Sequence, residues 1–196
     1  MFKDLHALNV IHLAPYIEVA TALIGKKRHA GGNMFRHQMD TMAILIDYGY
    51  IDSILLKAAL VHDILEDIPD FDEKQLLNIE PEAKDVYELV LEVTKKEGQS
   101  KEDFLRGIAL EGSEKAQILK CADRISNMIA LGYVTDSHFI ARYCEETECF
   151  IFPIAMMVNY DMYDELLWLT RTRSKYLEDS GFLEESYTKQ VADAIN

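Results

Sequence analysis

The chain has 196 residues, of which 49% are hydrophobic, and it carries a formal net charge of −14 at pH 7. A chain of this length and apolar content can bury a core of its own and is expected to form one domain. The strong negative charge argues against a surface that binds nucleic acid, because such a surface must attract phosphates.

Three further features predict a cytoplasmic protein that does not enter a membrane. The three cysteines are odd in number and lack Cys-x-x-Cys spacing, which favours reduced thiols. The longest apolar run, Phe150 to Val158, is too short to span a bilayer and contains Pro153. The first residues lack a basic stretch followed by an apolar core. The oligomeric state stays open.

Helical periodicity dominates the chain, and sustained two-residue alternation is absent, so the sequence predicts an all-α fold. In chain order, the predicted helices cover about residues 15–24, 34–48, 54–68, 72–78, 81–95, 100–110, 114–131, 137–176 and 184–194. A basic loop over residues 25–32 separates the first two helices. Pro69 ends the third helix, and Pro153 is expected to bend the long one. The residues predicted to cap helix N-termini are Asn33, Ser53, Ser100 and Ser113.

His62 and Asp63 lie in the most apolar of these helices, between Ile54 and Asp67. A helix that is apolar on nearly every face is normally buried. Burying an imidazole and a carboxylate costs several kcal/mol unless something compensates them, and a metal ion takes both as ligands. At about 100° per residue, Glu66 lies one turn after His62, on the same side of the helix. The ordinary interpretation of Glu66 and Asp67 alone is a solvated helix end.

Two residues on neighbouring helices complete a candidate ligand set. His37, with Thr41 one turn later, can face the core, although a single such histidine is more often a satisfied core residue. Asp123 has Lys120 and Asn127 on its face of the helix and, taken alone, would pair with Arg124 or another neighbouring cation. Together His37, His62, Asp63 and Asp123 offer two nitrogens and two oxygens. This mixed set suits a divalent transition metal with open positions, rather than a closed structural zinc site.

The order of these residues on consecutive helices resembles the HD superfamily of metal-dependent phosphohydrolases. Within it, the segment His62 to Asp67 is similar to the His-Asp-x-x-Glu-Asp motif of RelA/SpoT-type alarmone hydrolases. Residues 120–128 are similar to their Lys-Leu-Ala-Asp-Arg-Leu-x-Asn-Met stretch, and Arg28 matches the arginine of their substrate loop. The resemblance covers residues 15–135 and, given the chain length, is greatest to the stand-alone small alarmone hydrolases of metazoan SpoT-homologue type.

The resemblance implies an HD-type helical bundle over residues 1–196, with a core over 15–135 and a helical C-terminal extension over 137–196. It implies a hydrolase that removes the 3′-pyrophosphate of (p)ppGpp with metal-activated water, usually using one manganese ion. The implied metal ligands are His37, His62, Asp63 and Asp123. The implied catalytic residues are Glu66 and Asp67, which would orient the water and move its proton. The implied substrate-binding residues are Arg28, His29, Lys120 and Asn127.

The chain departs from this family at four positions. Gln38 stands where a proline usually follows the first metal histidine, a change expected to matter little. His29 replaces a lysine, which weakens a positive contact near neutral pH. Ile129 and Ala130 replace an Arg-Thr pair expected to meet the 3′-phosphates.

The departures leave two alternative functions open. One is an HD phosphohydrolase of another nucleotide, such as a nucleoside mono- or triphosphate or NADPH. The other is a non-catalytic HD-fold nucleotide sensor. The sequence also leaves zinc, iron and nickel open as alternatives to manganese. For the basic run 26–29, an ordinary solvated loop is the competing interpretation, and we favour it for Lys27.

Overall fold

The structure is a computed structural model that describes residue 8 and residues 11–182. All regular elements in this described part are helical, which confirms the all-α prediction. One isolated antiparallel bridge joins Lys27 to Asn33 across the basic loop. The helix predicted over 184–194 lies outside the described residues. Among the described residues, no helix is both long and apolar enough to cross a membrane.

The elements up to residue 77 are short, apart from the longer helix α3. They are α2 (Ala14–Ala20), η1 (Thr21–Leu23), α3 (Met34–Asp47), α4 (Ser53–Val61), α5 (Ile64–Asp67) and α6 (Lys74–Leu77). The later elements are α7 (Ala83–Val93), α8 (Lys101–Glu111), α9 (Glu114–Ala130), η2 (Leu131–Tyr133), α10 (Ser137–Glu146), the π-helical segment η3 (Thr147–Ile151), α11 (Phe152–Val158) and α12 (Tyr160–Asp179).

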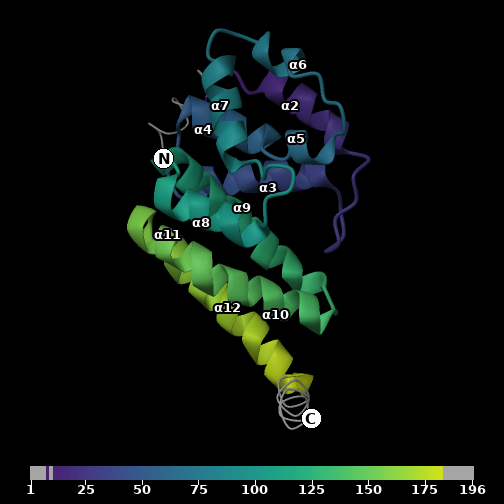
Figure 1. Ribbon diagram of the computed structural model, residues 1–196, viewed down its shortest axis with the longest axis vertical. Helices are drawn as coiled ribbons and strands as arrows, with labels where there is room; N and C mark the ends of the chain where they lie inside the picture. Colours follow the sequence, from purple (N-terminus) through teal and green to yellow (C-terminus); the bar gives the residue numbers. More distant parts are fainter. Residues whose placement is uncertain (1–7, 9–10, 183–196) are drawn as a thin grey trace.

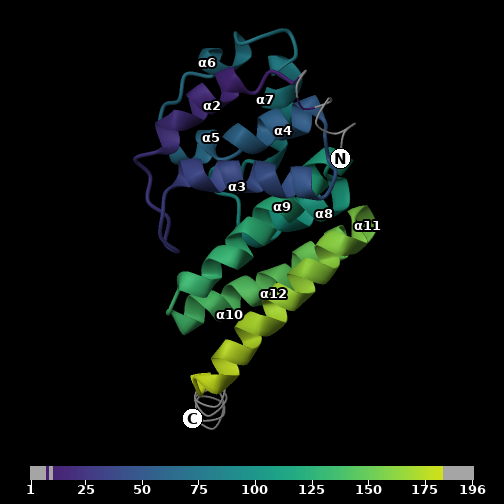
Figure 2. The same cartoon turned by 180° about the vertical axis from the view of Figure 1, so that it is seen from behind.

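Helix α9 lies at the centre of the molecule, between two groups of helices (Figures 1 and 2). On one side it packs against α3, α4 and α7, and on the other against α11 and α12. Its buried positions include both apolar residues and the polar residues Asp123, Arg124 and Ser126. A central helix with polar residues in its buried face brings those residues next to both helix groups, so α9 positions the site described below.

Three of the four predicted N-caps are confirmed. The Asn33 side chain accepts from the backbone N–H of Arg36 at the start of α3. Ser100 caps α8 by accepting from the N–H of Asp103, and Ser113 caps α9. These side chains satisfy N–H groups that have no partner within the helix, which fixes where each helix begins.

The fourth predicted cap, Ser53, is wrong by one residue. Asp52 caps α4 instead, because its carboxylate accepts from the N–H of Leu55 at 2.9 Å. The Ser53 hydroxyl donates to Glu82 at 2.6 Å. Serine and aspartate cap equally well, so the choice between neighbours depends on this tertiary contact rather than on local preference.

The helix predicted to run unbroken to Pro69 is interrupted at His62 and Asp63. Helix α4 ends at Val61, and α5 begins at Ile64. The apolar residues of α4 are buried as expected, from Leu55 to Val61. The interruption places both ionisable residues in the turn between the two helices.

The long C-terminal helix is also divided, and Pro153 is only part of the reason. Helix α10 passes through the π-helical segment η3 into α11, which has Pro153 in its first turn. The chain then turns at Asn159, whose side chain caps α12 by accepting from the N–H groups of Asp161 and Met162. Helix α12 therefore returns along α10 and α11 and lies against both (Figure 1).

Candidate active site and metal centre

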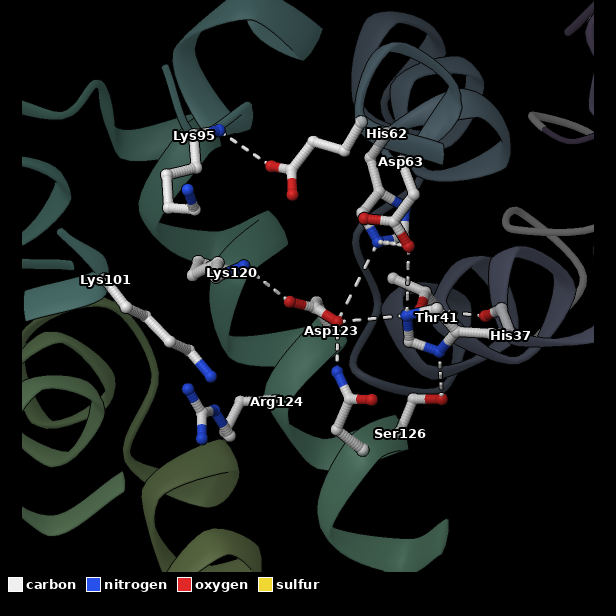
Figure 3. Close-up of polar contacts among 12 residues, drawn as sticks. His37, Thr41, His62, Asp63, Lys95, Lys101, Lys120, Asp123, Arg124 and Ser126 are labelled. Carbon is white, nitrogen blue, oxygen red and sulfur yellow. Dashed lines mark hydrogen bonds and ion pairs between the residues drawn. The ribbon is translucent and has the colours of Figure 1, made fainter. Parts of the chain in front are cut away.

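Three buried side chains from separate elements converge on one point. His37 comes from α3, His62 from the turn after α4, and Asp123 from α9. Their possible ligand atoms all lie within 4.8 Å of one another, and no exposed fraction exceeds 5%. In Figure 3 both imidazoles point towards the Asp123 carboxylate. The distance from His37 Nε2 to Asp123 Oδ1 is 3.0 Å, and from His62 Nε2 it is 3.8 Å.

Each imidazole is held by its other ring nitrogen. His37 Nδ1 lies 2.9 Å from the Ser126 hydroxyl, and His62 Nδ1 lies 2.9 Å from the carbonyl oxygen of Ala59. A carbonyl only accepts, so His62 carries its hydrogen on Nδ1 and, when neutral, has a lone pair on Nε2. That buried Nε2 has no hydrogen-bond partner among the described residues. An unpartnered imidazole nitrogen beside a carboxylate fits a metal ligand.

The Asp63 carboxylate lies beside both imidazoles but outside the tight group of three. Its Oδ2 is 3.2 Å from His62 Nε2 and 3.5 Å from His37 Nε2. The fully buried Gln38 donates its amide to the same oxygen at 2.9 Å. Gln38, expected to matter little, therefore contacts one of the four predicted ligands, through an amide group that a proline at this position would lack.

The electrostatics of the cluster favour an added cation. Burial lowers the pKa of His62, but the carboxylates of Asp63 and Asp123 outweigh burial and raise that pKa to about 9. The same carboxylates that hold a proton on the imidazole would attract a metal ion in its place. Burial opposes ionisation of Asp123, yet Lys120 and the imidazoles lower its pKa well below the usual range. Asp123 is therefore ionised and able to ligate.

Three residues of the cluster, His37, Asp63 and Asp123, line a cavity of about 450 Å³. Its lining combines acidic residues next to the imidazoles with basic and aromatic residues elsewhere. The lining residues are Lys27, Arg28, His29, Ala30, Met34, His37, Asp63, Glu66, Asp67, Lys95, Lys101, Phe104, Lys120, Asp123, Asn127, Leu131, Phe139 and Tyr143. A mixed acidic and basic lining of this kind suits a metal ion together with an anionic ligand.

The predicted catalytic residues both line the cavity. Glu66 accepts from the backbone N–H of Lys95 at 2.7 Å, and Asp67 lies 3.7 Å from the ammonium of Lys26. Desolvation and the nearby charge of Asp63 raise the pKa of both carboxyl groups. A raised pKa keeps a carboxyl group closer to the range in which it can accept and return a proton near neutral pH.

The predicted substrate-binding residues also line the cavity, although three of them are engaged with one another or with the cluster. Arg28 donates to the Asn127 side chain at 2.7 Å, and Asn127 donates to Asp123 at 2.5 Å. The Lys120 ammonium lies 2.7 Å from the second oxygen of Asp123. His29 instead packs on Phe139, with ring centroids 4.6 Å apart. Lys27, favoured as a solvated loop residue, also contributes to the lining.

The sequence missed several residues of the site. Ser126 orients His37, and Gln38 orients Asp63, but a single serine or glutamine in a helix gives no signal of such a role. Lys101 and Tyr143 reach the cavity from α8 and α10. Aromatic residues at helical spacing are more often core residues, so Tyr143 could be assigned to the site only from the fold.

A second cavity of about 920 Å³ adjoins the first along Arg28, His29 and Ala30. Ile129 and Ala130, which replace the Arg-Thr pair, line this second cavity. Ile129 is 45% exposed. The turn after Asn127 therefore presents an apolar surface where a cation and a hydroxyl were expected.

Comparison with known proteins shows which family part of the chain matches. Residues 34–128 match the family model of the HD domain, a range that begins with α3 and ends within α9. Proteins from Brucella ovis and Brucella abortus named GTP pyrophosphokinase rsh are 32% identical over 148 residues, which is 72% of this chain. The chain spans only 20% of the length of these curated relatives.

The fold is also similar to a solved structure. A metazoan orthologue of SpoT, which hydrolyses ppGpp, matches with a TM-score of 0.65 and 21% sequence identity. The match covers 82% of this chain and 94% of the other. Together with the family match, it confirms an all-α HD-type bundle and the resemblance to RelA/SpoT-type proteins.

Proposed function

We propose that this chain, which carries an HD domain, is a metal-dependent phosphohydrolase that removes the 3′-pyrophosphate of (p)ppGpp. The observation that carries the proposal is the buried Nε2 of His62, which has no hydrogen bond among the described residues and faces Asp63 and Asp123, two residues that line a cavity with basic walls. His37, His62, Asp63 and Asp123 would hold the ion.

When bound there, a divalent metal supplies a Lewis acid that polarises a phosphoryl oxygen and makes a water molecule more acidic. The protein's own residues complete the chemistry. Glu66 and Asp67 line the same cavity and would orient the attacking water and take its proton. Arg28 and Lys120 bring positive charge to the phosphates, and Asn127 holds Arg28 in place.

Two further observations support (p)ppGpp as the substrate. The metazoan SpoT orthologue with a similar fold hydrolyses ppGpp, and the Brucella relatives are named for a guanine nucleotide reaction. The five basic residues in the cavity lining, in a chain of net charge −14, provide a local site for an anionic nucleotide. We propose manganese as the ion, the cytoplasm as the location, and a nucleotide rather than nucleic acid or a membrane as the partner.

The test is an assay of pyrophosphate release from ppGpp by the purified chain with manganese. We expect turnover by the wild type and loss of about 1,000-fold or more in Asp63→Ala, because a ligand and its charge are removed. Asp164→Asn, an exposed change on α12, is the matched control and should retain full activity. A wild type that binds manganese but leaves ppGpp intact would exclude this substrate.

A second candidate, hydrolysis of another nucleotide, is favoured by one observation. Ile129 and Ala130 give the turn after Asn127 no cation with which to bind a 3′-pyrophosphate. A parallel screen of nucleoside mono- and triphosphates and NADPH with several divalent metals distinguishes the two. Turnover of one of these with none of ppGpp would favour the second candidate. Tight ppGpp binding without turnover of any nucleotide would favour the sensor.

A further inference from the structure

The outer face of α12 carries the single tryptophan of the chain. Trp168 is 66% exposed, although tryptophan is highly buried on average. The buried residues Met162, Leu166 and Leu177 lie on the other side of the helix, which packs against α9, α10 and α11. Helix α12 runs along one edge of the molecule (Figure 2). The tryptophan therefore lies on the side of α12 that faces away from the core.

Charged residues flank Trp168 on the same face, with one sign on each side. Two aspartates come seven and four residues before it, and two basic residues come three and seven residues after it. At about 100° per residue, all four lie within about 60° of the tryptophan around the helix. All five side chains are exposed. We call this set the α12 stripe, and its members are Asp161, Asp164, Trp168, Arg171 and Lys175.

Most charges of the α12 stripe have no partner in the described part of the chain. Asp161, Asp164 and Arg171 make no ion pair there. Lys175 lies 3.6 Å from Asp179, one turn later, but both side chains are mostly exposed. Such a surface pair contributes little and can rearrange. The charges of the stripe are therefore available to a binding partner.

The α12 stripe is complementary to a second copy of itself that runs in the opposite direction. A two-fold axis at Trp168 would place Asp161 opposite Lys175 of the second copy, and Asp164 opposite Arg171. A parallel arrangement would instead place like charges together, which is unfavourable. Two copies of a chain with net charge −14 repel each other, so local matching of opposite charges decides which faces can meet.

We propose that the chain forms a symmetric homodimer through the α12 stripe, with the two helices antiparallel and the two Trp168 side chains in contact at the two-fold axis. Aromatic anchors supply much of the affinity of an interface, whereas exposed ion pairs contribute little and fix the orientation. At 1.5 Å per residue the stripe is about 21 Å long. This is a small interface, so we expect a dissociation constant of about 1–100 µM.

The dimer interface is separate from the candidate active site. No member of the α12 stripe lines either cavity described above, and His37, His62 and Asp123 come from one chain. Dissociation should therefore leave nucleotide turnover unchanged, and the Asp164→Asn control keeps its activity. Measurements of association test this proposal without reference to the proposed function.

The first test measures self-association of the full-length chain by sedimentation equilibrium over about 1–200 µM. We expect Trp168→Ala to weaken the dimer by about tenfold or more. The control Leu110→Ala, which removes a side chain that is 77% exposed on α8, should stay within about twofold. Because the chain has one tryptophan, its fluorescence should shift to shorter wavelength as the wild type associates. Thermal unfolding within about 2 °C of the wild type confirms that each variant is folded.

The second test reverses charges on opposite sides of the axis. Asp164→Lys and Arg171→Glu each place like charges opposite one another, and each should weaken self-association by about tenfold. An equal mixture of the two variants should restore the dimer, because one then carries two positive charges at these positions and the other two negative charges.

Three results would overturn the proposal. The first is a wild type that stays monomeric at every concentration, which would leave the α12 stripe to a different partner. The second is a dimer that Trp168→Ala and Leu110→Ala affect equally. The third is a mixture of the two charge-reversed variants that associates no better than either variant alone.

Discussion

Helix α4 carries one buried ionic group at its middle and another just beyond its end, and the two groups differ in how their charges are satisfied. Lys57, in the middle of the helix, is 2% exposed, and its ammonium lies 2.6 Å from Glu80 and 2.5 Å from Glu82. Burial lowers the pKa of Lys57, but the two glutamates outweigh burial and raise it. In this group the cation has two carboxylates within ion-pair distance, and the group lines neither of the cavities described above.

His62, one residue beyond the end of α4, is equally buried, but the carboxylates beside it make no hydrogen bond to its ring nitrogen. Its Nε2 has no hydrogen bond among the described residues, and the charges that face it are carboxylates. It also lies beside a cavity that Asp63 and Asp123 line. The comparison shows that a buried charge is not by itself a sign of function. The informative signs are a buried ring nitrogen without a hydrogen bond among the described residues and a position beside a cavity.

The largest difference between the two groups should appear on changing Glu66, which lines the same cavity as Asp63. Glu66→Gln keeps the shape of the side chain and removes the group that would take a proton. We expect kcat to fall by about 100-fold or more, with the stability of the chain unchanged within about 0.5 kcal/mol. Pyrophosphate release and urea unfolding measure the two quantities. Unchanged kcat would exclude Glu66 from proton transfer.

The reverse pattern is expected at Lys57. Lys57→Met leaves Glu80 and Glu82 without their cation, and should cost about 2–3 kcal/mol of the free energy of unfolding. The activity of the folded protein should stay within about twofold, because Lys57 lies outside the site cavity. Urea unfolding checks the stability, with the exposed Lys84→Met as control. A large loss of activity without loss of stability would mean that the Lys57 group and the His62 group are not independent.

The smallest effect is expected at Asp52, the N-cap of the same helix. Burial raises the pKa of Asp52, but Lys115 and the backbone N–H of Leu55 outweigh burial and lower it. A carboxyl group whose pKa is lower in the folded state stabilises the protein at pH values above the ordinary aspartate pKa. This stabilisation is lost as the pH falls through the pKa of the folded state. Asp52→Asn keeps a capping oxygen and should cost about 0.5 kcal/mol at pH 7, since the ion pair is partly exposed.

Thermal unfolding across the range from pH 7 to pH 3 tests this prediction. The difference between Asp52→Asn and the wild type should shrink as the pH falls below the ordinary aspartate pKa of 3.8. A difference that is constant across the range would assign the effect to capping rather than to charge.

Much of the fold was predictable because its signals are local. Asn33, Ser100 and Ser113 cap helices by contacts within three residues, and a sequence shows such contacts directly. The interruption at His62 and Asp63 was not predictable, since nothing in the adjacent apolar residues opposes a continuous helix. The turn at Asn159 was missed for a similar reason: α12 returns along its predecessors to bury apolar residues, a tertiary effect.

The ligand candidates were predictable because a buried histidine or aspartate conflicts with an apolar surrounding. Residues that support them carry no such conflict. Gln38 and Ser126 are compatible with any helix, and their roles depend on which side chain the neighbouring helix presents. Lys101 gave no signal either, because it reaches the cavity only through the packing of α8 against α9 and η3.

The central claim is that one divalent metal ion binds beside His62, just beyond the end of α4. Metal stoichiometry tests this claim most directly. The metal-free chain is equilibrated with manganese, freed of excess ion, and measured for bound metal per chain. We predict one ion per chain for the wild type and for Lys57→Met, and a loss of at least about tenfold in affinity for His62→Ala. Equal manganese binding by the wild type and His62→Ala, or no binding by either, would contradict the account.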